Sequence, residues 1–332
     1  MSTELTNEQR RQLIDIQQVF EAWRSSRKAA RRHMRWLRRH GFEYLHYKTG
    51  RTERSLGRRS QETEARMADH KTARERHRRT GERLKSMARV NRALRLNRVP
   101  QPAVRVLRAL DEAGLLGDGL FVIGTNALYA YEMQSGVLFD SALVATGDFD
   151  LPWDARHRLR LAVSRLSPGG VLGLLKEADA TYSSADDYGF RARNADGYYV
   201  DLFCPEAEPP RARLAEGDID PIPTAGGNWL AAAPKTEAVV IGQDGLPARM
   251  VCVDPRIFAL HKWWLSKQRS RQAASRPRDA QQAHVVAAIS AQFLNLKFDR
   301  RLQKQLPAEL AAGIDALRGV RLDALRYQAE HY

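Results

Sequence analysis

Cysteine and long apolar segments are scarce in this 332-residue chain. Only Cys204 and Cys252 occur, without the spacing of a metal site, so we expect two ordinary thiols in a reducing compartment. No apolar run approaches the roughly 20 residues that a membrane span requires. The first residues have neither the charge nor the apolar block of a secretion signal. These absences predict a cytoplasmic protein with no membrane partner.

The remaining composition is that of a globular protein, with 43% hydrophobic and 28% charged residues. A chain of this length can bury a substantial core and is expected to form two or three domains. The pattern predicts a basic, mainly helical region over 1–100, a core domain over 101–207, and a hairpin followed by a C-terminal helical domain over 208–332. The fold class expected from these elements is α+β.

Positive charge is concentrated at the start of the chain. The net charge is +15, and residues 1–100 alone contain 27 Lys and Arg against 11 Asp and Glu. The rest of the chain is close to neutral. A basic segment joined to a near-neutral domain predicts a polyanionic partner for the first part and chemistry in the second.

The basic region is expected to be helical over most of its length. Apolar residues at helical spacing predict a helix from Asn7, continuing or restarting through the arginine-rich segment up to His40. A strand is expected over 42–48, a basic loop over 49–60 and a polar helix over 61–89. Alternating charges on this last helix favour a solvated face, with a nucleic-acid or substrate contact as the alternative.

The central stretch begins with a strand signal followed by a turn. Residues 120–123 form a short apolar run that suits a buried strand. Gly124 lets the backbone bend sharply, and Thr125 or Asn126 can cap a helix expected over 127–133. Such a turn can also cradle a phosphate, although glycine-bearing junctions of this kind are common.

Two aspartates follow a second apolar run. Residues 142–145 are expected to form a strand that continues into Asp148 and Asp150. Residues two apart on a strand share a face, so both carboxylates project together while Phe149 and Leu151 point into the core. Adjacent carboxylates repel each other unless a cation lies between them, and Mg²⁺ is the usual occupant beside oxygen ligands and phosphates.

A third aspartate lies in a predicted hairpin. Residues 190–203 contain Asp196-Gly197, a strong turn signal, and Asp201 falls in the second arm.

The other predicted elements are mostly helices. Helices are expected over 104–115, 154–166, 171–178, 256–267, 278–294 and 306–330; a hairpin is expected to pair 237–241 with 248–253; and prolines and glycines favour a long loop over 206–227.

The order of turn, helix, acid-x-acid strand and later single acid resembles the nucleotidyltransferase superfold of DNA polymerase beta. The segments 91–100, 124–132 and 145–151 are similar to signatures of a prokaryotic nucleotidyltransferase-domain family, and the resemblance extends from about Tyr44 to about Ala283. It implies a polymerase-beta-like core over 101–207, a mixed sheet flanked by helices. One departure is that the superfold usually has Gly-Ser in the turn, where this chain has Gly124-Thr125.

The resemblance also implies roles for the acids. Asp148, Asp150 and Asp201 would be catalytic and would bind Mg²⁺ or Mn²⁺, the first two holding both metals and Asp201 assisting at the nucleophile. Gly124, Thr125 and Asn126 would bind the leaving phosphates of a nucleoside triphosphate, together with the amides of the helix N-terminus.

A downstream cluster resembles the lysine helix and Arg-Asp pair of the closer family and of abortive-infection nucleotidyltransferase toxins, which suggests a toxin or defence role. Lys262 would neutralise the triphosphate, with Arg278 fixing either the triphosphate or Asp279. The alternative is an ordinary buried ion pair between packed helices.

Two functions are compatible with the sequence. The first is a metal-dependent nucleotidyltransferase that transfers a nucleoside monophosphate from a nucleoside triphosphate, ATP among the candidates, to a hydroxyl of RNA, protein or a small molecule. The expected acceptor is a nucleic acid bound by the basic N-terminal region. The second is an inert nucleic-acid-binding module on the same fold. The complete set of three aspartates favours the enzyme.

Overall fold

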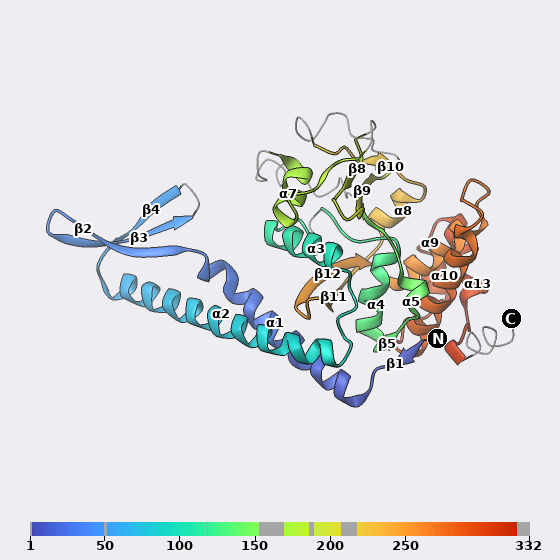
Figure 1. Ribbon diagram of the computed structural model, residues 1–332, viewed down its shortest axis with the longest axis horizontal. Helices are drawn as coiled ribbons and strands as arrows, with labels where there is room; N and C mark the ends of the chain where they lie inside the picture. Colours follow the sequence, from blue (N-terminus) through green and yellow to red (C-terminus); the bar gives the residue numbers. More distant parts are fainter. Residues whose placement is uncertain are drawn as a thin grey trace. The chain divides into compact units, whose positions relative to one another are not determined.

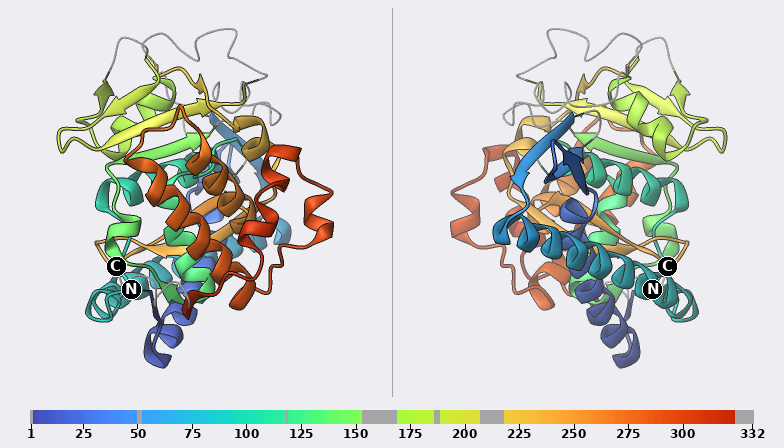
Figure 2. Two further views of the ribbon diagram at one scale, coloured as in Figure 1. Left: turned by 90° about the vertical axis from the view of Figure 1, so that its right-hand side faces the viewer. Right: turned by 90° about the vertical axis from the view of Figure 1, so that its left-hand side faces the viewer.

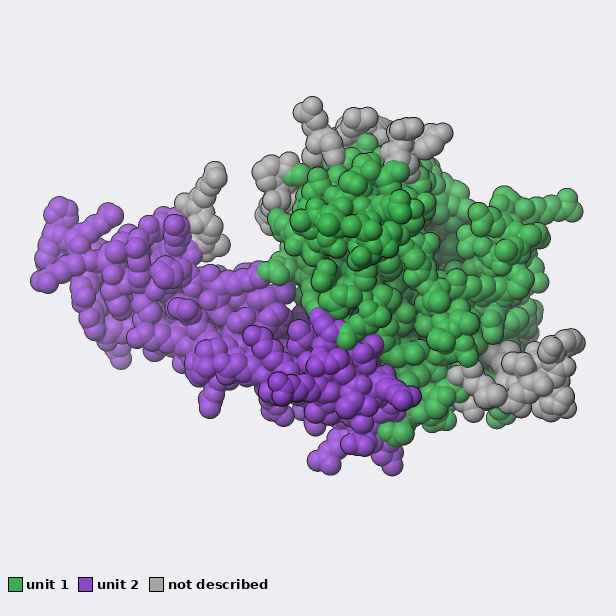
Figure 3. All heavy atoms as spheres, viewed as in Figure 1, with its two compact units in different colours: residues 1–6, 98–243, 248–332 green, residues 7–97, 244–247 purple. Residues whose placement is uncertain are grey.

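The computed structural model describes residues 2–49, 52–117, 119–152, 169–185, 189–206 and 218–323. It divides into two compact units, which Figure 3 shows in different colours. Unit 1 comprises residues 1–6, 98–243 and 248–332, and unit 2 comprises residues 7–97 and 244–247. The helix expected over 154–166 lies outside the described residues.

Two antiparallel helices form the body of unit 2, α1 (Asn7–Ala30) and α2 (Gln61–Ala93), which lie side by side (Figure 1). Their apolar residues recur at helical spacing, so each helix presents one buried stripe to the other. The buried residues include Ile16 and Phe20 on α1 and Leu84 on α2. Both helices were expected, α1 ending earlier than the sequence predicts.

A three-stranded antiparallel sheet joins these helices, formed by β2 (His33–Arg39), β3 (Phe42–Thr49) and β4 (Thr52–Arg58). The helix expected up to His40 and the loop expected over 49–60 are therefore wrong for β2 and β4. The backbone of His40 and Gly41 has positive φ at both positions, 48° and 79°, as a tight hairpin turn requires. This turn brings β2 against β3, and the ladder of pairs between them replaces helical hydrogen bonds.

The main sheet of unit 1 is centred on β9 (Tyr199–Cys204). On one side it pairs in parallel with β6 (Asp148–Pro152), and on the other in antiparallel with β8 (Arg191–Arg193). The short strands β7 (Ser183–Ser184) and β10 (Ile222–Pro223) complete it. The hairpin expected over 190–203 is confirmed, with Gly197 at φ 79° in its turn.

The segment 120–123 connects this sheet to a second hairpin. The amide of Ile123 donates to the Asp150 carbonyl at 3.1 Å, and that of Val122 donates to the Val251 carbonyl at 2.7 Å. Val251 belongs to β12 (Pro247–Val253), which pairs with β11 (Lys235–Ile241) as expected. The segment is thus extended and buried, but it is held by single bridges rather than by a continuous ladder.

Two local expectations around the central stretch are wrong. Residues 142–145 do not begin a strand, because most of them form the short helix α5 (Ser141–Val144), capped by Asp140 Oδ1, which accepts from the Ala142 amide at 2.9 Å. The turn at Gly124 leads through a 3₁₀ turn, η1 (Thr125–Ala127), into α4 (Leu128–Ser135). Neither Thr125 nor Asn126 caps this helix with its side chain.

Two packed helices cover the site, α9 (Pro255–Lys267) and α10 (Ser275–Gln292), which lie side by side in Figures 1 and 2. Asp254 caps α9, its carboxylate accepting from the Arg256 amide at 2.8 Å. The single helix expected over 306–330 is not found in the described part of that segment. Short helices stand there instead, between Pro307 and Gly319, the latter at φ 77°.

The other elements of unit 1 are α3 (Gln101–Ala113), α7 (Gly170–Ala178), α8 (Gly227–Ala232), α11 (Arg300–Gln303), α12 (Ala308–Ala311), α13 (Ile314–Leu317), β1 (Thr3–Glu4) and β5 (Val137–Leu138). Within the described ranges, the helices are all too short or too polar to cross a membrane.

Candidate active site

Three aspartates lie on one face of the main sheet. Asp148 and Asp150 are two residues apart on β6, and the parallel register of β6 and β9 places Asp201 directly beside Asp150. Phe149, between the two aspartates of β6, and Val200, next to Asp201 on β9, are fully buried on the opposite face. The alternation of apolar and acidic residues on both strands therefore turns the three carboxylates to the same side.

The Gly124 turn packs directly against Asp150. A Cβ atom on Gly124 would lie 1.8 Å from Asp150 Oδ2, and the residue has φ +64°. Both the close approach and the backbone conformation require glycine. The Gly124 turn, which is expected to bind phosphate, therefore packs on the Asp150 carboxylate, which is expected to bind metal.

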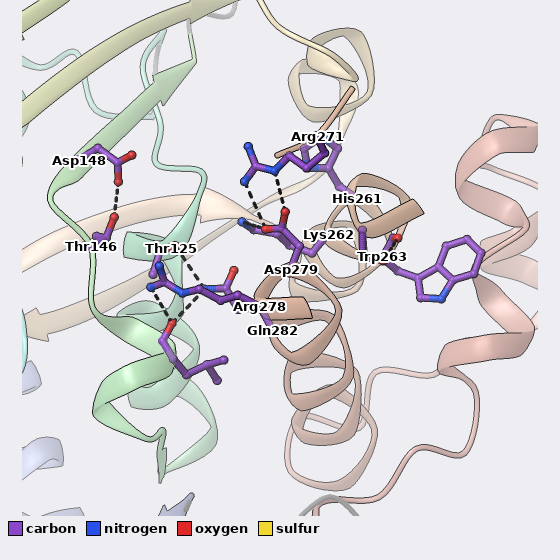
Figure 4. A network of polar contacts seen from close by, with 12 residues as sticks. Thr125, Thr146, Asp148, His261, Lys262, Trp263, Arg271, Arg278, Asp279 and Gln282 are labelled. Atoms are coloured by element: carbon purple, nitrogen blue, oxygen red, sulfur yellow. Dashed lines mark hydrogen bonds and ion pairs between the residues drawn. The ribbon is translucent and has the colours of Figure 1, made fainter. Parts of the chain in front are cut away.

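Asp148 and its strand are held by neighbouring side chains. The Thr146 hydroxyl donates to the Asp148 carboxylate (Figure 4). The buried Asn126 donates from Nδ2 to the Asp148 carbonyl at 2.6 Å and to the Tyr198 hydroxyl at 3.3 Å. The Asn126 side-chain amide thus supports the backbone of β6, and in this arrangement it is not directed to a phosphate.

Asp201 is bound by an arginine on the neighbouring strand. Arg191 on β8 pairs with Asp201 in the sheet register, and its Nε and Nη2 donate to the two carboxylate oxygens at 2.7 and 2.5 Å. Such a two-point contact is a strong form of ion pair. Both oxygens of Asp201 are therefore engaged by Arg191.

Asp150 is the most electrostatically strained of the three acids. Burial, followed by the charges of Asp148 and Asp201, raises the pKa of Asp150 to about 7. A cation beside these carboxylates would relieve that repulsion, and carboxylate oxygens are the ligands that Mg²⁺ prefers. The donor set of Asp148 and Asp150 thus fits a magnesium or manganese ion.

Asp201 does not complete a ready-made metal cluster. Among the residues that the structure describes, no three His, Cys, Asp or Glu side chains are grouped so that they could hold a metal ion. The ion pair with Arg191 accounts for this in physical terms, because it fixes the Asp201 oxygens on a guanidinium group. Asp201 would have to exchange that partner to bind a metal.

A buried ion-pair network lies where α9 packs on α10. Lys262 Nζ is 2.8 Å from Asp279 Oδ1, and Arg271 Nε is 2.8 Å from Asp279 Oδ2 (Figure 4). Although burial favours the neutral acid, Lys262 and Arg271 hold the pKa of Asp279 below its ordinary value. Lys262 is thus a member of a structural ion pair, and the partner of Asp279 besides Lys262 is Arg271 rather than Arg278.

Arg278 and Gln282, one turn apart on α10, hold the backbone that leads into β6. Arg278 donates to the carbonyls of Leu143, at 3.2 Å, and Ala145. Gln282 donates from Nε2 to the Leu143 carbonyl at 2.9 Å and to the Thr125 hydroxyl oxygen at 3.2 Å. Because Thr125 accepts this bond, its own O–H stays available as a donor.

These side chains surround one cavity of about 470 Å³. Of the residues expected from the sequence, Asp148, Asp150, Asp201, Thr125, Lys262 and Arg278 line it, whereas Gly124 lines an adjoining cavity. The three aspartates of β6 and β9 occupy the sheet side together with Arg191 on β8. The opposite side is formed by the α9–α10 region, with its cations Lys262, Arg271 and Arg278 and the paired Asp279. The arrangement can hold a polyanion together with a divalent cation.

Four functional candidates were missed in the sequence: Thr146, Arg191, Arg271 and Gln282. Arg191 carried a signal, since it stands ten residues before Asp201 in a predicted hairpin and would face it in the right register. Arg271 and Gln282 gave none, because they reach the site only through the packing of α9 against α10.

Comparison with known families gives one match, a nucleotidyltransferase family that covers residues 101–307. Comparisons with curated proteins and with solved structures returned no match. The matched residues include the Gly124 turn, all three aspartates and the helices that carry Lys262 and Gln282. Since the match spans more than half of the chain, the protein belongs to this nucleotidyltransferase family.

Proposed function

We propose that the protein is a metal-dependent nucleotidyltransferase with a polymerase-beta-like core. It would transfer a nucleoside monophosphate from a nucleoside triphosphate to an acceptor hydroxyl and release pyrophosphate. The observation that carries this proposal is the cavity in which three aspartates on one sheet face are opposed by basic side chains. Family membership supports nucleotidyl transfer in general.

Each part of the cavity has a role in this reaction. Asp148 and Asp150 would hold Mg²⁺ or Mn²⁺, which when bound stabilises the attacking and leaving oxygens of the displacement. Asp201, at the neighbouring register position, would accept the proton of the acceptor hydroxyl. The Thr125 hydroxyl and the amides of the Gly124 turn would bind the leaving phosphates.

Arg191 is the residue whose contact must change. It would leave Asp201 for a phosphate group as the nucleotide enters, because a guanidinium group binds phosphate and carboxylate with the same two-point geometry. Arg271, with a side chain 38% exposed, is the second cation able to turn to the nucleotide while Lys262 keeps Asp279 paired.

A nucleic acid is the acceptor that unit 2 favours. Arginines at the end of β4 lie over aromatic rings of its sheet. The Arg58 guanidinium lies 3.3 Å from the centroid of Phe42, which is 52% exposed, and that of Arg59, the residue after β4, lies 5.3 Å from the centroid of Trp36. Bases stack on exposed aromatic and guanidinium groups, while arginines neutralise the phosphates. Single-stranded nucleic acid matches both features.

Label placement tests the proposal. The protein is incubated with Mg²⁺, cellular RNA and each nucleoside triphosphate, labelled at either the α- or the γ-phosphate. We expect transfer of the α label alone, with the other two phosphates released as pyrophosphate. Transfer of the γ label would indicate a kinase, and nucleic-acid binding without transfer of either label would identify an inert binding module.

A further inference from the structure

A second cavity, of about 260 Å³, adjoins the acidic one. The two share the walls formed by Asp150, Phe203, Lys262, Ser270 and Arg271. Beyond these shared residues, the second cavity is bounded by Gly124 and Ile123 on one side and by α8 and α9 on the other. A ligand that fills the acidic cavity can therefore extend into the second one past Lys262 and Arg271.

The walls of the second cavity differ in character from those of the first. Apart from the shared residues, they are mainly apolar and aromatic, as shown by Leu230, Phe258, Trp264 and Leu265. Among the described residues, Asp150 at the shared boundary is the one acid that lines this cavity. Such walls suit a flat, uncharged ring system better than a second phosphate group.

The aromatic wall is held rigidly. Trp264 stacks on the His261 ring, with centroids 5.9 Å apart and planes inclined by 26°, and it meets Trp229 edge to face at 4.9 Å. Gly226 packs on the same group, since a Cβ there would lie 3.0 Å from both His261 and Trp229. A wall fixed in this way is preorganised for a ring and costs little side-chain entropy on binding.

Polar groups that line this cavity can form hydrogen bonds with a ring system. The ring of His261 contacts the Ala225 carbonyl through Nε2 at 3.2 Å, so that nitrogen carries the proton. Burial lowers the pKa of His261 to about 4, and the ring is neutral at physiological pH. Nδ1 is then a hydrogen-bond acceptor, and Thr224 and Gln268 add a hydroxyl and an amide to the lining.

We propose that this second cavity binds the nucleobase of the nucleoside triphosphate, with Trp264 and His261 forming its aromatic wall. The inference rests on the proposed function, because it assumes that the phosphates lie in the acidic cavity. It adds the site that selects the base. Lys262 and Arg271, at the boundary shared by both cavities, mark where the nucleoside meets the phosphates.

Two probes separate the two cavities. Inorganic tripolyphosphate with Mg²⁺ can occupy only the acidic cavity, whereas a nucleoside triphosphate occupies both, and the affinity of each is measured by titration calorimetry. Trp264→Ala should weaken binding of the preferred nucleoside triphosphate by about tenfold, the loss expected for one base–aromatic stacking contact, and leave tripolyphosphate binding unchanged.

Trp263→Ala is the matched control. Trp263 precedes Trp264 on the same helix, but its ring packs against Gly313, at 2.9 Å from an added Cβ, and points away from Lys262 in Figure 4. It should change neither affinity. Leu265→Phe is a second variant that fills the cavity instead of emptying it, and it should also weaken nucleotide binding alone.

The outcomes distinguish a failure of the base site from a failure of the proposed function. If the wild-type protein binds tripolyphosphate and binds every nucleoside triphosphate no more tightly, the base site is refuted and the proposed function stands. If neither probe binds, the proposed function itself fails. Equal loss of both probes in the folded Trp264→Ala and Leu265→Phe variants would also overturn the base site, because it would mean that the wall only supports the acidic cavity.

Discussion

Asp150 combines three constraints in one side chain. It is packed against the Gly124 turn, it lies between Asp148 on its own strand and Asp201 on the next, and it lines both cavities. Its pKa of about 7 results from burial first and from the neighbouring carboxylates second. In the protein without metal, an ionised Asp150 therefore opposes folding.

The stability of the metal-free protein should depend on pH through Asp150. The folded-state pKa of about 7 lies above the unfolded value of about 4, so the native state binds the extra proton between these pH values. Stability then falls as pH rises from 4 to 7. Asp150→Asn should remove this loss and exceed the wild type by on the order of 2 kcal/mol at pH 8, a value reduced for partial exposure.

Urea unfolding in the presence of a chelator measures this difference at pH 4.5 and pH 8. Asp196→Asn, in the exposed turn of the hairpin that contains Asp201, is the matched control and should run parallel to the wild type. If the free energy of unfolding of Asp150→Asn and of the wild type changes with pH in parallel, Asp150 is not strained.

Lys262 is a second residue with two roles to separate. Its ammonium group pairs with Asp279, and both side chains are almost fully buried. Lys262→Met should lower the free energy of unfolding by about 3 kcal/mol, because it leaves a buried carboxylate with Arg271 as its remaining partner. Lys262→Met combined with Asp279→Asn should recover much of that loss.

Nucleotide affinity in the double variant identifies the functional part. If Lys262 also contacts the triphosphate, the Michaelis constant for the nucleotide stays raised although stability has recovered. Recovery of both quantities would mean that Lys262 is only a structural partner of Asp279.

Among the elements of the site, the Gly124 turn leaves no room for a single added methyl group. Gly124→Ala would drive a Cβ to 1.8 Å from Asp150 Oδ2 in a backbone conformation with positive φ. We expect loss of nucleotidyl transfer and destabilisation by about 1–3 kcal/mol. Gly147→Ala, immediately before Asp148, is the control, since nothing lies within 4 Å of its added Cβ. Comparable loss in both variants would argue against a special role for the Gly124 turn.

Local sequence signals were sufficient to predict the elements that depend on neighbouring residues alone. The Asp196-Gly197 turn and the alternation around Asp201 were sufficient for the β8–β9 hairpin, and the alternation around Phe149 placed the first two aspartates on one face. The strand β2 was not predictable in this way. Arginine has a high helix propensity, and only pairing with β3 selects the extended form of the segment 33–39.

Within the site, the acids were predictable and most of their partners were not. Asp148 and Asp150 stand two residues apart in the sequence, so a periodicity argument reaches them. Arg271 and Gln282 approach from the α9–α10 connection and from α10, more than 100 residues later, through tertiary packing that no local pattern encodes. The short helix α5 was mistaken for a strand because four apolar residues fit either form, and the Asp140 cap decides between them.

For the whole molecule, the distribution of charge bears on the proposed nucleic-acid acceptor. Within unit 2 many basic side chains already have acidic partners, such as Arg66 with Glu62 and Arg78 with Glu75 on α2. The sheet carries further exposed arginines at 38, 39 and 54. These are the cations that a nucleic-acid backbone would meet on the sheet.

Neutralising the sheet arginines should flatten the salt dependence of nucleic-acid binding. Replacing Arg38, Arg39 and Arg54 by Gln should weaken binding at low salt and lower the slope of log affinity against log salt by roughly 0.7 per lost phosphate contact on a single strand. Arg66→Gln with Arg78→Gln, on α2, is the control for charge loss and should have a much smaller effect. Identical slopes for the wild type and the sheet variant would remove the sheet from the binding surface.

The most direct test of the account is the amount of pyrophosphate formed per nucleotide transferred. With Mg²⁺, the preferred nucleoside triphosphate and the acceptor, the wild-type protein should form one pyrophosphate for each labelled monophosphate attached. Asp148→Asn should form none while it keeps the wild-type fold by circular dichroism and its nucleic-acid affinity. Pyrophosphate formation by the Asp148→Asn protein at the wild-type rate would contradict the assignment of the three aspartates as the catalytic centre.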